Sequence, residues 1–317
     1  MTKTYPSFIV DAFTTTSFAG NPAAVCLIPT LLTDLEYQKI AAEFNLSETA
    51  FPIPLDPKSN FKSSTKFSLR WFTPKNEVPL CGHATLATSH VLFNEIGNSN
   101  EEIQFETKSG ILTVKKDGDG NVKMDFPKYE LNSVNVSGLV NPLKTVFQEI
   151  EGPDFVLEVI KCITPDKNAI DSILLAKKLG VLVINLSPSI KKSDFDAFRL
   201  NVNKALEIHD GSLFRGLAIS IVPSNPVSQG FIDSKNEPFD YACRYFGPWD
   251  GVNEDPATGS AQCAIGPICG KLLAKNKLYG FQAFPNRGAQ FRLHLQDDRV
   301  ILTGSSVTVI RGEIAYN

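Results

Sequence analysis

Two stretches of the chain carry the residue types that acid–base chemistry needs. The stretch "LRWFTPKNEVPLCGHATLATS" (69–89) contains Cys81 and His83, and "CRYFGPWDGVNEDPATGSAQC" (243–263) contains Asp255. In each, a glycine leads into a run of small and apolar residues, which predicts the start of a helix. The unpaired N–H groups at such a start bind carboxylates. The pattern indicates a carboxylate site with acid–base groups beside it, although the glycines could instead serve only close packing.

The two stretches repeat one pattern. Three positions match at a constant offset of 174 residues, namely Arg70, Phe72 and Pro74 with Arg244, Phe246 and Pro248. Gly82 and Gly259 follow at an offset of 177, so the second copy has a loop three residues longer. The segments after both glycines are apolar on nearly every face, which is typical of buried helices. Chance similarity is the alternative, but we infer two related domains, each with strands around a central helix.

A third candidate is the carboxylate of Glu48 in "NLSETAF" (45–51). It follows the expected end of a helix and leads into an apolar strand. Such a carboxylate is either a solvated loop charge or a buried acid whose pKa is raised by the loss of water. Composition alone favours the loop charge.

The sequence lacks other catalytic patterns. It has no G-x-S-x-G, H-E-x-x-H or phosphate-binding glycine motif. No metal site is expected, because metal-ligand spacing with a cysteine or another histidine is absent for His83, His90, His209 and His294. His90 is expected to be a hydrogen-bonded core residue. Cys81 precedes a helix start, where its pKa could be lowered, but a buried thiol is the simpler interpretation.

Composition places the chain among ordinary globular proteins. Its 317 residues suit two domains of about 150 residues each. A net charge of −3 does not favour binding to nucleic acid. No window is long and apolar enough for a membrane span, and the first residues do not resemble a signal peptide. We therefore expect a cytoplasmic protein whose six cysteines are reduced thiols.

The pattern of elements favours an α+β fold. Thr33 and Glu36 form a capping box for a helix that Asn45 ends. Strands are expected at 49–55, 66–74, 180–186 and 213–223, and a meander of hairpins at 101–127. Helices are expected near 167–178, 192–206 and 260–275. Pro267 should kink or shorten the last of these. Helices and strands do not alternate strictly, so a doubly wound sheet fits less well.

Four motifs in this order resemble those of the phenazine biosynthesis PhzF-like family, including its eukaryotic members: "GNPAAV", "NLSETAF", "LRWFTPKNEVPLCGHATLA" and "RYFGPWDGVNEDPATGSA". The resemblance covers essentially the whole chain. It implies the fold of diaminopimelate epimerase and proline racemase, in which each of two pseudo-symmetric domains is a mixed, mainly antiparallel sheet around a central apolar helix. The first domain would cover 1–128, completed by about 304–317, and the second 129–303, with the active site in the cleft between them.

The resemblance also implies a reaction. The enzyme after which the family is named isomerises a dihydro-hydroxyanthranilate by moving a proton without a cofactor. By this resemblance we expect a cofactor-independent isomerase of a small carboxylate, in which burial raises the pKa of Glu48 and lets it take a proton from a C–H bond. His83 and Asp255 would assist it. The positions implied to line the substrate site are Asn21, Gly82, Gly259 and Ser260.

Departures from the family pattern leave two alternatives open. Racemases of this fold use a cysteine at each glycine-led turn, whereas here Cys81 fills the first position and Thr258 the second. A symmetric two-thiol mechanism is therefore not expected, but an amino-acid epimerase or racemase using Cys81 with Glu48 is one alternative. The other is a non-catalytic ligand-binding or interaction protein that retains the pocket. Homodimers are common in this fold, although the sequence shows no exposed apolar stripe that demonstrates one.

Overall fold

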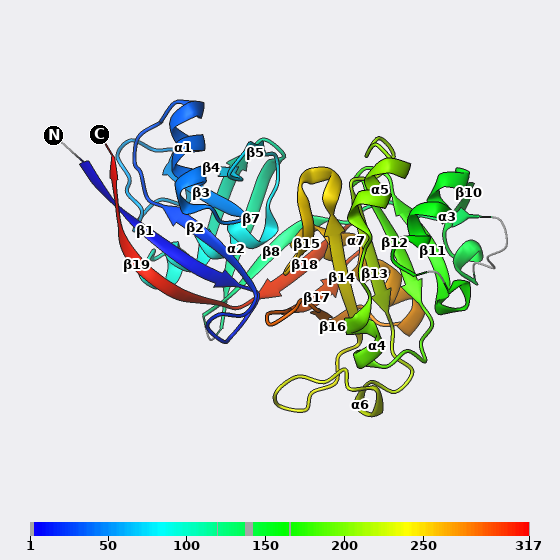
Figure 1. Ribbon diagram of the computed structural model, residues 1–317. Helices are drawn as coiled ribbons and strands as arrows, with labels where there is room; N and C mark the ends of the chain where they lie inside the picture. Colours follow the sequence, from blue (N-terminus) through cyan, green and yellow to red (C-terminus); the bar gives the residue numbers. More distant parts are fainter. Residues whose placement is uncertain (1–2, 119, 137–141, 165, 317) are drawn as a thin grey trace. The chain divides into compact units, whose positions relative to one another are not determined.

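The structure is a computed structural model, and it describes residues 3–118, 120–136, 142–164 and 166–316. The chain divides into two compact units. Unit 1 consists of Met1–Phe126, Ala289–Phe291 and Ile301–Asn317, and unit 2 of Pro127–Gly288 and Arg292–Val300. The last strand therefore belongs to the unit that begins the chain, and Figure 1 shows β19 (Ser306–Tyr316) alongside β1 (Lys3–Ala12).

Unit 1 is built on a mixed, mainly antiparallel sheet. Its strands pair in the order β19, β1, β2 (Asn21–Cys26), β3 (Glu48–Pro54), β4 (Lys66–Phe72), β6 (Glu102–Thr107), β7 (Gly110–Asp117) and β8 (Asn121–Pro127). The pairs β2–β3 and β4–β6 are parallel. Because parallel neighbours need a crossover connection, a helix joins each of these pairs: α1 (Asp34–Phe44) and α2 (Gly82–His90). The short strand β5 (Glu77–Val78) pairs with β4 just before α2.

Helix α1 has the ends that the sequence predicts. The Thr33 hydroxyl accepts the N–H of Glu36 at 3.4 Å, and the Glu36 carboxylate accepts the N–H of Thr33 at 2.6 Å. Asn45 ends the helix in the left-handed region, with φ of 50°. The buried face of α1 packs on the sheet through Tyr37, whose ring centre lies 4.7 Å from that of Phe51. The capping box and the helix are confirmed.

Helix α2 is the buried central helix of unit 1. Every residue from 82 to 89 is buried. The hydroxyls of Thr85, Thr88 and Ser89 donate to backbone carbonyls one turn earlier at 2.6 to 2.8 Å, so their burial leaves none of these groups unpaired. The helix continues as one π-helical turn, Val91–Glu95. The all-round apolar pattern of the sequence thus marks a core helix.

Unit 2 repeats this arrangement. Its strands β11 (Ile170–Ala176), β12 (Val181–Leu186), β13 (Gly216–Ile221), β14 (Tyr241–Gly247) and β16 (Lys277–Gln282) pair in the same order and directions as β1, β2, β3, β4 and β6. Helix α7 (Gly259–Leu273) precedes β16 as α2 precedes β6. The other helices and strands of unit 2 are β9 (Asn132–Asn135), β10 (Gln148–Glu151), α3 (Asp154–Lys161), α4 (Lys192–Ala197), α5 (Val202–Ile208), α6 (Pro226–Gln229) and β15 (Val252–Asp255). The strands β17 (Ala289–Leu295) and β18 (Arg299–Gly304) each have residues in both units. The predicted α+β class and the internal repeat are confirmed.

The repeat extends to an ion pair. Arg70 in β4 donates to both carboxylate oxygens of Glu77 at 2.8 and 2.7 Å, and Arg244 in β14 donates to both of Glu254 at 2.7 and 3.0 Å. Each guanidinium also lies over the phenylalanine two residues later, 5.0 and 5.3 Å from the ring centre. Chance similarity does not explain such a match. Glu254, next to the candidate Asp255, is therefore a structural carboxylate.

Two helix predictions in unit 2 need correction. The range 167–178 forms a short 3₁₀ turn and then β11, because its apolar run pairs with β12 across a tight turn at Gly180, where φ is 72°. Periodicity cannot separate so short an apolar run from a helix. The range 192–206 is broken into α4 and α5, because Asn201 caps a new helix by accepting the N–H of Lys204 at 3.3 Å.

Of the two effects expected of Pro267, a kink or a shorter helix, the structure contradicts the shortening. The helix runs for 15 residues through this proline. Its neighbours hold it closely: a Cβ at Gly266 would lie 2.4 Å from the side chain of Leu293, and one at Gly270 would lie 2.4 Å from that of Leu295. Tertiary packing of the helix compensates for the hydrogen bond that proline cannot donate.

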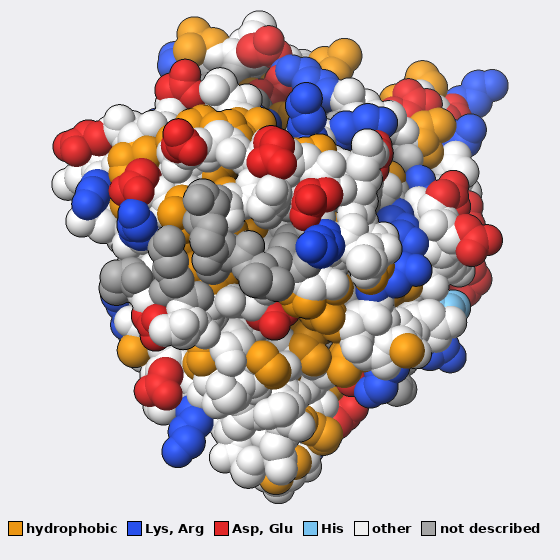
Figure 2. All heavy atoms as spheres, turned by 90° about the vertical axis from the view of Figure 1, so that its right-hand side faces the viewer, with side chains coloured by type: hydrophobic (Ala, Val, Ile, Leu, Met, Phe, Trp, Pro, Cys, Tyr) orange, Lys and Arg blue, Asp and Glu red, His pale blue; other side chains and the backbone are white. Residues whose placement is uncertain are grey.

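The remaining sequence expectations concern the thiols and the surface. All six cysteines are free thiols, as predicted, and all six are buried. Within the described residues, no helix has the length and apolar character required to cross a membrane. On the face shown in Figure 2, acidic and basic side chains of the described residues are interspersed with neutral and apolar ones.

Candidate active site

The candidate residues of unit 1 converge where two strands and the central helix begin. Asn21 is the first residue of β2, and Glu48 is the first of β3. These strands are parallel, with Ala23 opposite Glu48, so both candidates lie at the same edge of the sheet. Cys81 and His83 flank the first residue of α2. Sequence-distant side chains are thus brought into one cluster.

His83 is the centre of this cluster. Its Nε2 lies 3.1 Å from Glu48 Oε2 and 3.2 Å from Ser47 Oγ. Its Nδ1 lies 3.2 Å from Asn21 Nδ2 and 3.4 Å from Cys81 Sγ. The ring is 5% exposed, so these contacts form in near absence of water. Ser47, which stands beside Glu48 in the "NLSETAF" motif, was not singled out from the sequence.

The contacts of Asn21 fix where the imidazole proton lies. The Ser47 hydroxyl donates to Asn21 Oδ1 at 3.3 Å, which turns the amide nitrogen toward His83. With the amide in this orientation, the neutral form of the ring accepts at Nδ1 and carries its proton on Nε2, whereas the charged form carries a proton on each nitrogen. Nε2 lies 3.2 Å from Ser47 Oγ in hydrogen-bond geometry and 3.1 Å from Glu48 Oε2 outside that geometry. The cluster therefore places an imidazole directly beside a carboxylate.

The charges of the cluster differ from the sequence expectation. Burial alone would raise the pKa of Glu48, but the adjacent His83 reverses this, so the pKa of Glu48 is lowered. Burial likewise opposes charge on His83, yet Cys81 and Glu48 raise the pKa of His83 well above its usual range. Burial and the charge of Glu48 raise the pKa of the Cys81 thiol. The predicted raised pKa of Glu48 is wrong: at rest this carboxyl is ionised and can accept a proton.

One oxygen of Glu48 is incompletely bonded. Glu48 Oε2 is buried, and among the described residues no donor meets it in hydrogen-bond geometry, although His83 lies 3.1 Å away. The whole side chain is 16% exposed, although this oxygen is buried. A buried oxygen with unused hydrogen-bonding capacity is uncommon in folded proteins. It suits an acceptor whose partner is a bound molecule.

The loop before Asn21 is a feature of unit 1 alone. Eight residues (13–20) join β1 to β2, whereas four join the equivalent strands β11 and β12. The buried carboxylate of Asp11 accepts the N–H of Phe18 at 2.6 Å. Gly20 has a φ of 61°, and a Cβ there would lie 2.1 Å from a backbone oxygen. These contacts set the entry of the chain into β2 and hence the position of Asn21.

Unit 2 carries the other candidates at the start of α7. Asp255 is the last residue of β15, and Gly259 and Ser260 begin the helix. The Thr258 hydroxyl donates to Asp255 Oδ2. The structure thus gathers Asp255, Gly259 and Ser260 in unit 2, and Asn21, Glu48, Gly82 and His83 in unit 1. That both sets act on one substrate stays a prediction.

The two halves of the repeat are chemically unequal. Counting from the matched arginines of β4 and β14, the counterpart of Glu48 is Gly216. A Cβ at Gly216 would lie 2.1 Å from the Tyr245 hydroxyl, so the tyrosine occupies the space that the acid would need. The counterpart of Cys81, the residue before the central helix, is Thr258. At these two matched positions unit 1 has a carboxylate and a thiol, whereas unit 2 has a glycine and a hydroxyl.

The cluster also has the donor types of a metal site. One ligand atom each from Glu48, Cys81 and His83 lies within 4.8 Å of the others, and sequence spacing did not show this. The donors are a carboxylate oxygen, a sulfur and an imidazole nitrogen, a set that suits transition metals. Both ring nitrogens of His83 are already engaged with side chains of the cluster. The observed contacts are those of a proton network.

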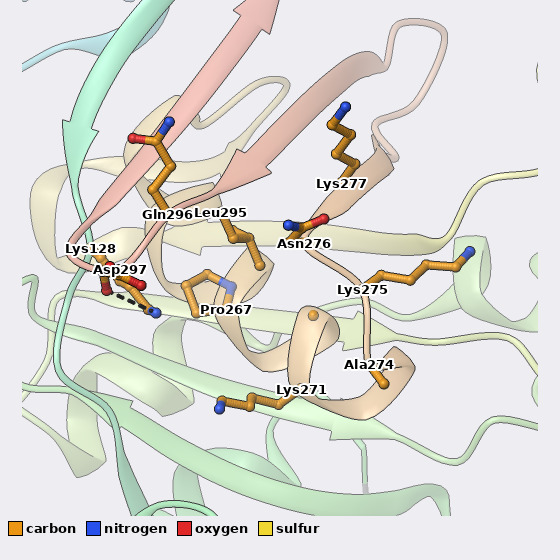
Figure 3. A pocket seen from close by; sticks show the side chains of 11 residues that line it. Lys128, Pro267, Lys271, Ala274, Lys275, Asn276, Lys277, Leu295, Gln296 and Asp297 are labelled. Atoms are coloured by element: carbon orange, nitrogen blue, oxygen red, sulfur yellow. Dashed lines mark hydrogen bonds between the residues drawn. The ribbon is translucent and has the colours of Figure 1, made fainter.

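A separate cavity lies in unit 2, at the C-terminal end of α7. Its volume is about 990 Å³. Lysines dominate its lining, yet Figure 3 shows that the side chains of Lys271, Lys275 and Lys277 point in different directions. The side chain of Lys275 is paired with Asp240 at 2.6 Å. None of the candidate site residues lines this cavity, and its charges do not converge on a common point.

Comparison with known proteins shows the family of the chain. The model of the phenazine biosynthesis-like protein family matches residues 10–312. The chain belongs to this family. A phenazine biosynthesis-like domain-containing protein from Bos taurus is 39% identical over 310 residues, which is 98% of each chain. A protein from Halalkalibacterium halodurans, named an uncharacterized isomerase, is 35% identical over 321 residues, again 98% of each chain.

Solved structures give the same fold for the family. A PhzF-family protein from Enterococcus faecalis matches with a TM-score of 0.77 and 29% identity, covering 98% of this chain and 99% of that one. A probable proline racemase from Agrobacterium radiobacter matches with a TM-score of 0.55 and 10% identity, covering 99% and 93%. The second match shows the fold alone. The epimerase-like α+β fold implied by the motifs is confirmed, and relatives within the family are named isomerases.

Proposed function

We propose that this family member is an isomerase that moves a proton on a small carboxylate substrate. Glu48 takes the proton from one carbon and returns it to another, so no bond is oxidised or reduced and no cofactor takes part. The observation that carries the proposal is the buried Oε2 of Glu48, which is ionised at rest and lacks a hydrogen-bond donor among the described residues. In this proposal it is the base of the first step.

His83 and the start of α2 supply the electrostatics of this reaction. His83, whose Nε2 lies 3.1 Å from Glu48 Oε2, favours the charged form of Glu48. The first N–H groups of α2, at Gly82 and His83, lie at the positive end of the helix dipole. They would bind the substrate carboxylate and stabilise negative charge that develops when the C–H bond breaks. Asp255, Gly259 and Ser260 are proposed to contribute the second half of the site.

The inequality of the two halves favours an isomerase over a two-base racemase. A racemase that removes a proton on one face and adds one on the other needs a base in each half. In unit 2 the counterpart of Glu48 is Gly216, and the counterpart of Cys81 is Thr258. A hydroxyl is a far weaker base than a carboxylate. The carboxylate that unit 2 does contribute, Asp255, accepts a hydrogen bond from Thr258 and is not at the position matched to Glu48. We therefore assign both the removal and the return of the proton to Glu48.

The variant Glu48→Gln tests the proposal. Glutamine keeps the size of the side chain but cannot take a proton. We expect turnover to fall by about 100-fold or more, while stabilisation by bound ligand in thermal unfolding is retained. Glu43→Gln, on the exposed face of α1, is the matched control and should be fully active. Native turnover in Glu48→Gln would contradict the proposal.

A second candidate is an amino-acid epimerase or racemase that uses Cys81 with Glu48. The contact between Cys81 Sγ and His83 Nδ1 at 3.4 Å favours it, because the imidazole can take the thiol proton. Cys81→Ala separates the two candidates. If the protein is an isomerase based on Glu48, Cys81→Ala keeps most of the activity. If it is an epimerase that needs the thiol, the native protein interconverts two stereoisomers of the substrate and Cys81→Ala does not.

A further inference from the structure

Two fully buried glutamines surround the start of α7 in unit 2. Gln262 lies in the first turns of α7, and Gln282 ends β16; both are 0% exposed. The Tyr241 hydroxyl donates to Gln262 Oε1 at 2.7 Å. A buried amide is destabilising unless its donors and acceptor are all bonded. The sequence pattern of an apolar helix and strand gave no reason to expect two amides at these positions.

The partners of both amides are in the turn between β15 and α7. Gln282 Nε2 donates to the Asp255 carbonyl at 2.7 Å and to Thr258 Oγ1 at 3.1 Å. Gln282 Oε1 accepts the N–H of Thr258 at 2.9 Å and Nε2–H of Gln262 at 3.2 Å. Gln262 Nε2 also donates to the Thr258 carbonyl at 3.2 Å. Rotating the Gln282 amide by half a turn would place its NH₂ group against two donors, the N–H of Thr258 and the Nε2–H of Gln262. The amide therefore has one orientation, which fixes the donor and the acceptor in each of its hydrogen bonds.

That orientation decides where the Thr258 proton points. A hydroxyl has a single proton. Because Gln282 already donates to Thr258 Oγ1, the hydroxyl proton is directed away from Gln282, and it is donated to Asp255 Oδ2. The chain of donors therefore runs from a buried amide, through a hydroxyl, to a carboxylate oxygen.

We propose that Gln282, Gln262 and Thr258 are positioning residues that fix the orientation and ionised form of the Asp255 carboxylate. Thr258 is thus a hydrogen-bond donor to Asp255 and not a substitute for the second thiol of a racemase. The catalytic meaning of this inference rests on the proposed function, in which Asp255 belongs to the site. The network itself does not depend on it.

Tyr245 and Glu254 are titratable neighbours of Asp255 and form part of the background of a titration. Tyr245 in β14 is paired with Asp255 in the register of the two strands, and burial, followed by the charge of Asp255, raises the pKa of Tyr245. Glu254, the preceding residue, is held by Arg244. Changing Thr258 alters none of these three groups, so a shift in the titration of Asp255 reports on the lost hydroxyl.

The test is a ¹³C NMR titration of the full chain labelled at aspartate carboxyl carbons. The signal of Asp255 is assigned as the one missing from Asp255→Asn, and Asp233 serves as an internal reference because its own donors are remote from Thr258 in the sequence. Thr258→Val should raise the titration midpoint of Asp255 by about one pH unit, and Thr258→Ser should restore it. An unchanged midpoint in Thr258→Val overturns the proposal.

Two further measurements keep the result decisive. Gln282→Leu should also raise the titration midpoint of Asp255, so the relay (the hydrogen-bond chain from Gln282 through Thr258 to Asp255) can be tested even where Thr258→Val folds poorly. An unshifted midpoint in a folded Gln282→Leu also overturns the proposal. On a turned-over substrate, Thr258→Val should lower kcat more than it raises KM. Full turnover in Glu48→Gln would refute the proposed function and leave the titration result standing. An inactive Glu48→Gln with an unshifted Asp255 would refute only the relay.

Discussion

Replacing Glu254 should destabilise unit 2 far more than the equivalent replacement of Glu77 destabilises unit 1. The two glutamates bind equivalent arginines of the repeat, but the arginines are buried differently. The Arg244 side chain is 1% exposed and the Arg70 side chain 24%. The molecule therefore contains its own matched control for the effect of burial on an ion pair.

The magnitude follows from what remains after each change. Besides Glu254, Arg244 has backbone carbonyls as acceptors, those of Phe195, Asp196 and Phe198 at 3.2, 3.2 and 2.6 Å. Carbonyls satisfy its donors but do not neutralise its charge, so Glu254→Gln leaves a buried cation and costs about 3–5 kcal/mol. Arg70 keeps Asp34 at 2.7 Å and access to water. Glu77→Gln should therefore cost about 1 kcal/mol or less.

The two tryptophans of the chain allow each unit to be followed separately. Trp71 lies in β4 of unit 1, and Trp249 follows β14 of unit 2. Urea unfolding is measured by fluorescence in a Trp71→Phe background for Glu254→Gln, and in a Trp249→Phe background for Glu77→Gln. Equal losses of unfolding free energy in the two units, or a loss below about 1 kcal/mol for Glu254→Gln, would refute the reasoning from burial.

Three further outcomes are expected. The Glu48–His83 pair should stabilise the fold in the pH range between the lowered pKa of Glu48 and the raised pKa of His83. Because the pKa of Glu48 is lowered from 4.5, the stabilisation is lost as the pH falls through that pKa. Because the pKa of His83 is raised well above 6.5, the stabilisation is also lost as the pH rises through that pKa. Thermal unfolding of the native protein and Glu48→Gln across this range checks it, and a pH-independent difference would contradict it. Cys81 should react only slowly with iodoacetamide in the native state, because it is 6% exposed and its pKa is raised. Mass spectrometry of the labelled peptide measures the rate, and rapid labelling of the native protein would contradict its burial. Gly216→Ala should lower the unfolding free energy by about 1–3 kcal/mol, because its Cβ would lie 2.1 Å from a tyrosine hydroxyl of β14. The control Gly118→Ala should not lower it, because a Cβ at Gly118 meets nothing within 4 Å. Equal urea midpoints for the two variants would refute the steric argument.

Features with a local physical cause could be predicted from the sequence. The capping box at Thr33 needs only residues within one helical turn, and Asn45 ends the helix because its side chain tolerates a left-handed backbone. The buried helices after Gly82 and Gly259 follow from segments that are apolar on every face. The internal repeat was visible because one strand-and-turn pattern occurs twice with its arginine and proline in place.

Features that depend on long-range contacts could not be predicted in the same way. The range 167–178 is a strand because β12 pairs with it, and nothing within the segment specifies that partner. The pKa of Glu48 is lowered because His83, far along the chain, is held beside it by α2. The amide of Gln282 was invisible because a lone glutamine in a strand gives no signal until its partners are known.

Deuterium incorporation from D₂O, followed by mass spectrometry, tests most directly whether Glu48 moves a proton on a carboxylate. The native protein, Glu48→Gln and the control Glu43→Gln are incubated with a panel of cyclic and amino-acid carboxylates. The account predicts exchange at a carbon in the native protein and the control, and its loss in Glu48→Gln. Undiminished exchange in Glu48→Gln would contradict the central role given to this carboxylate.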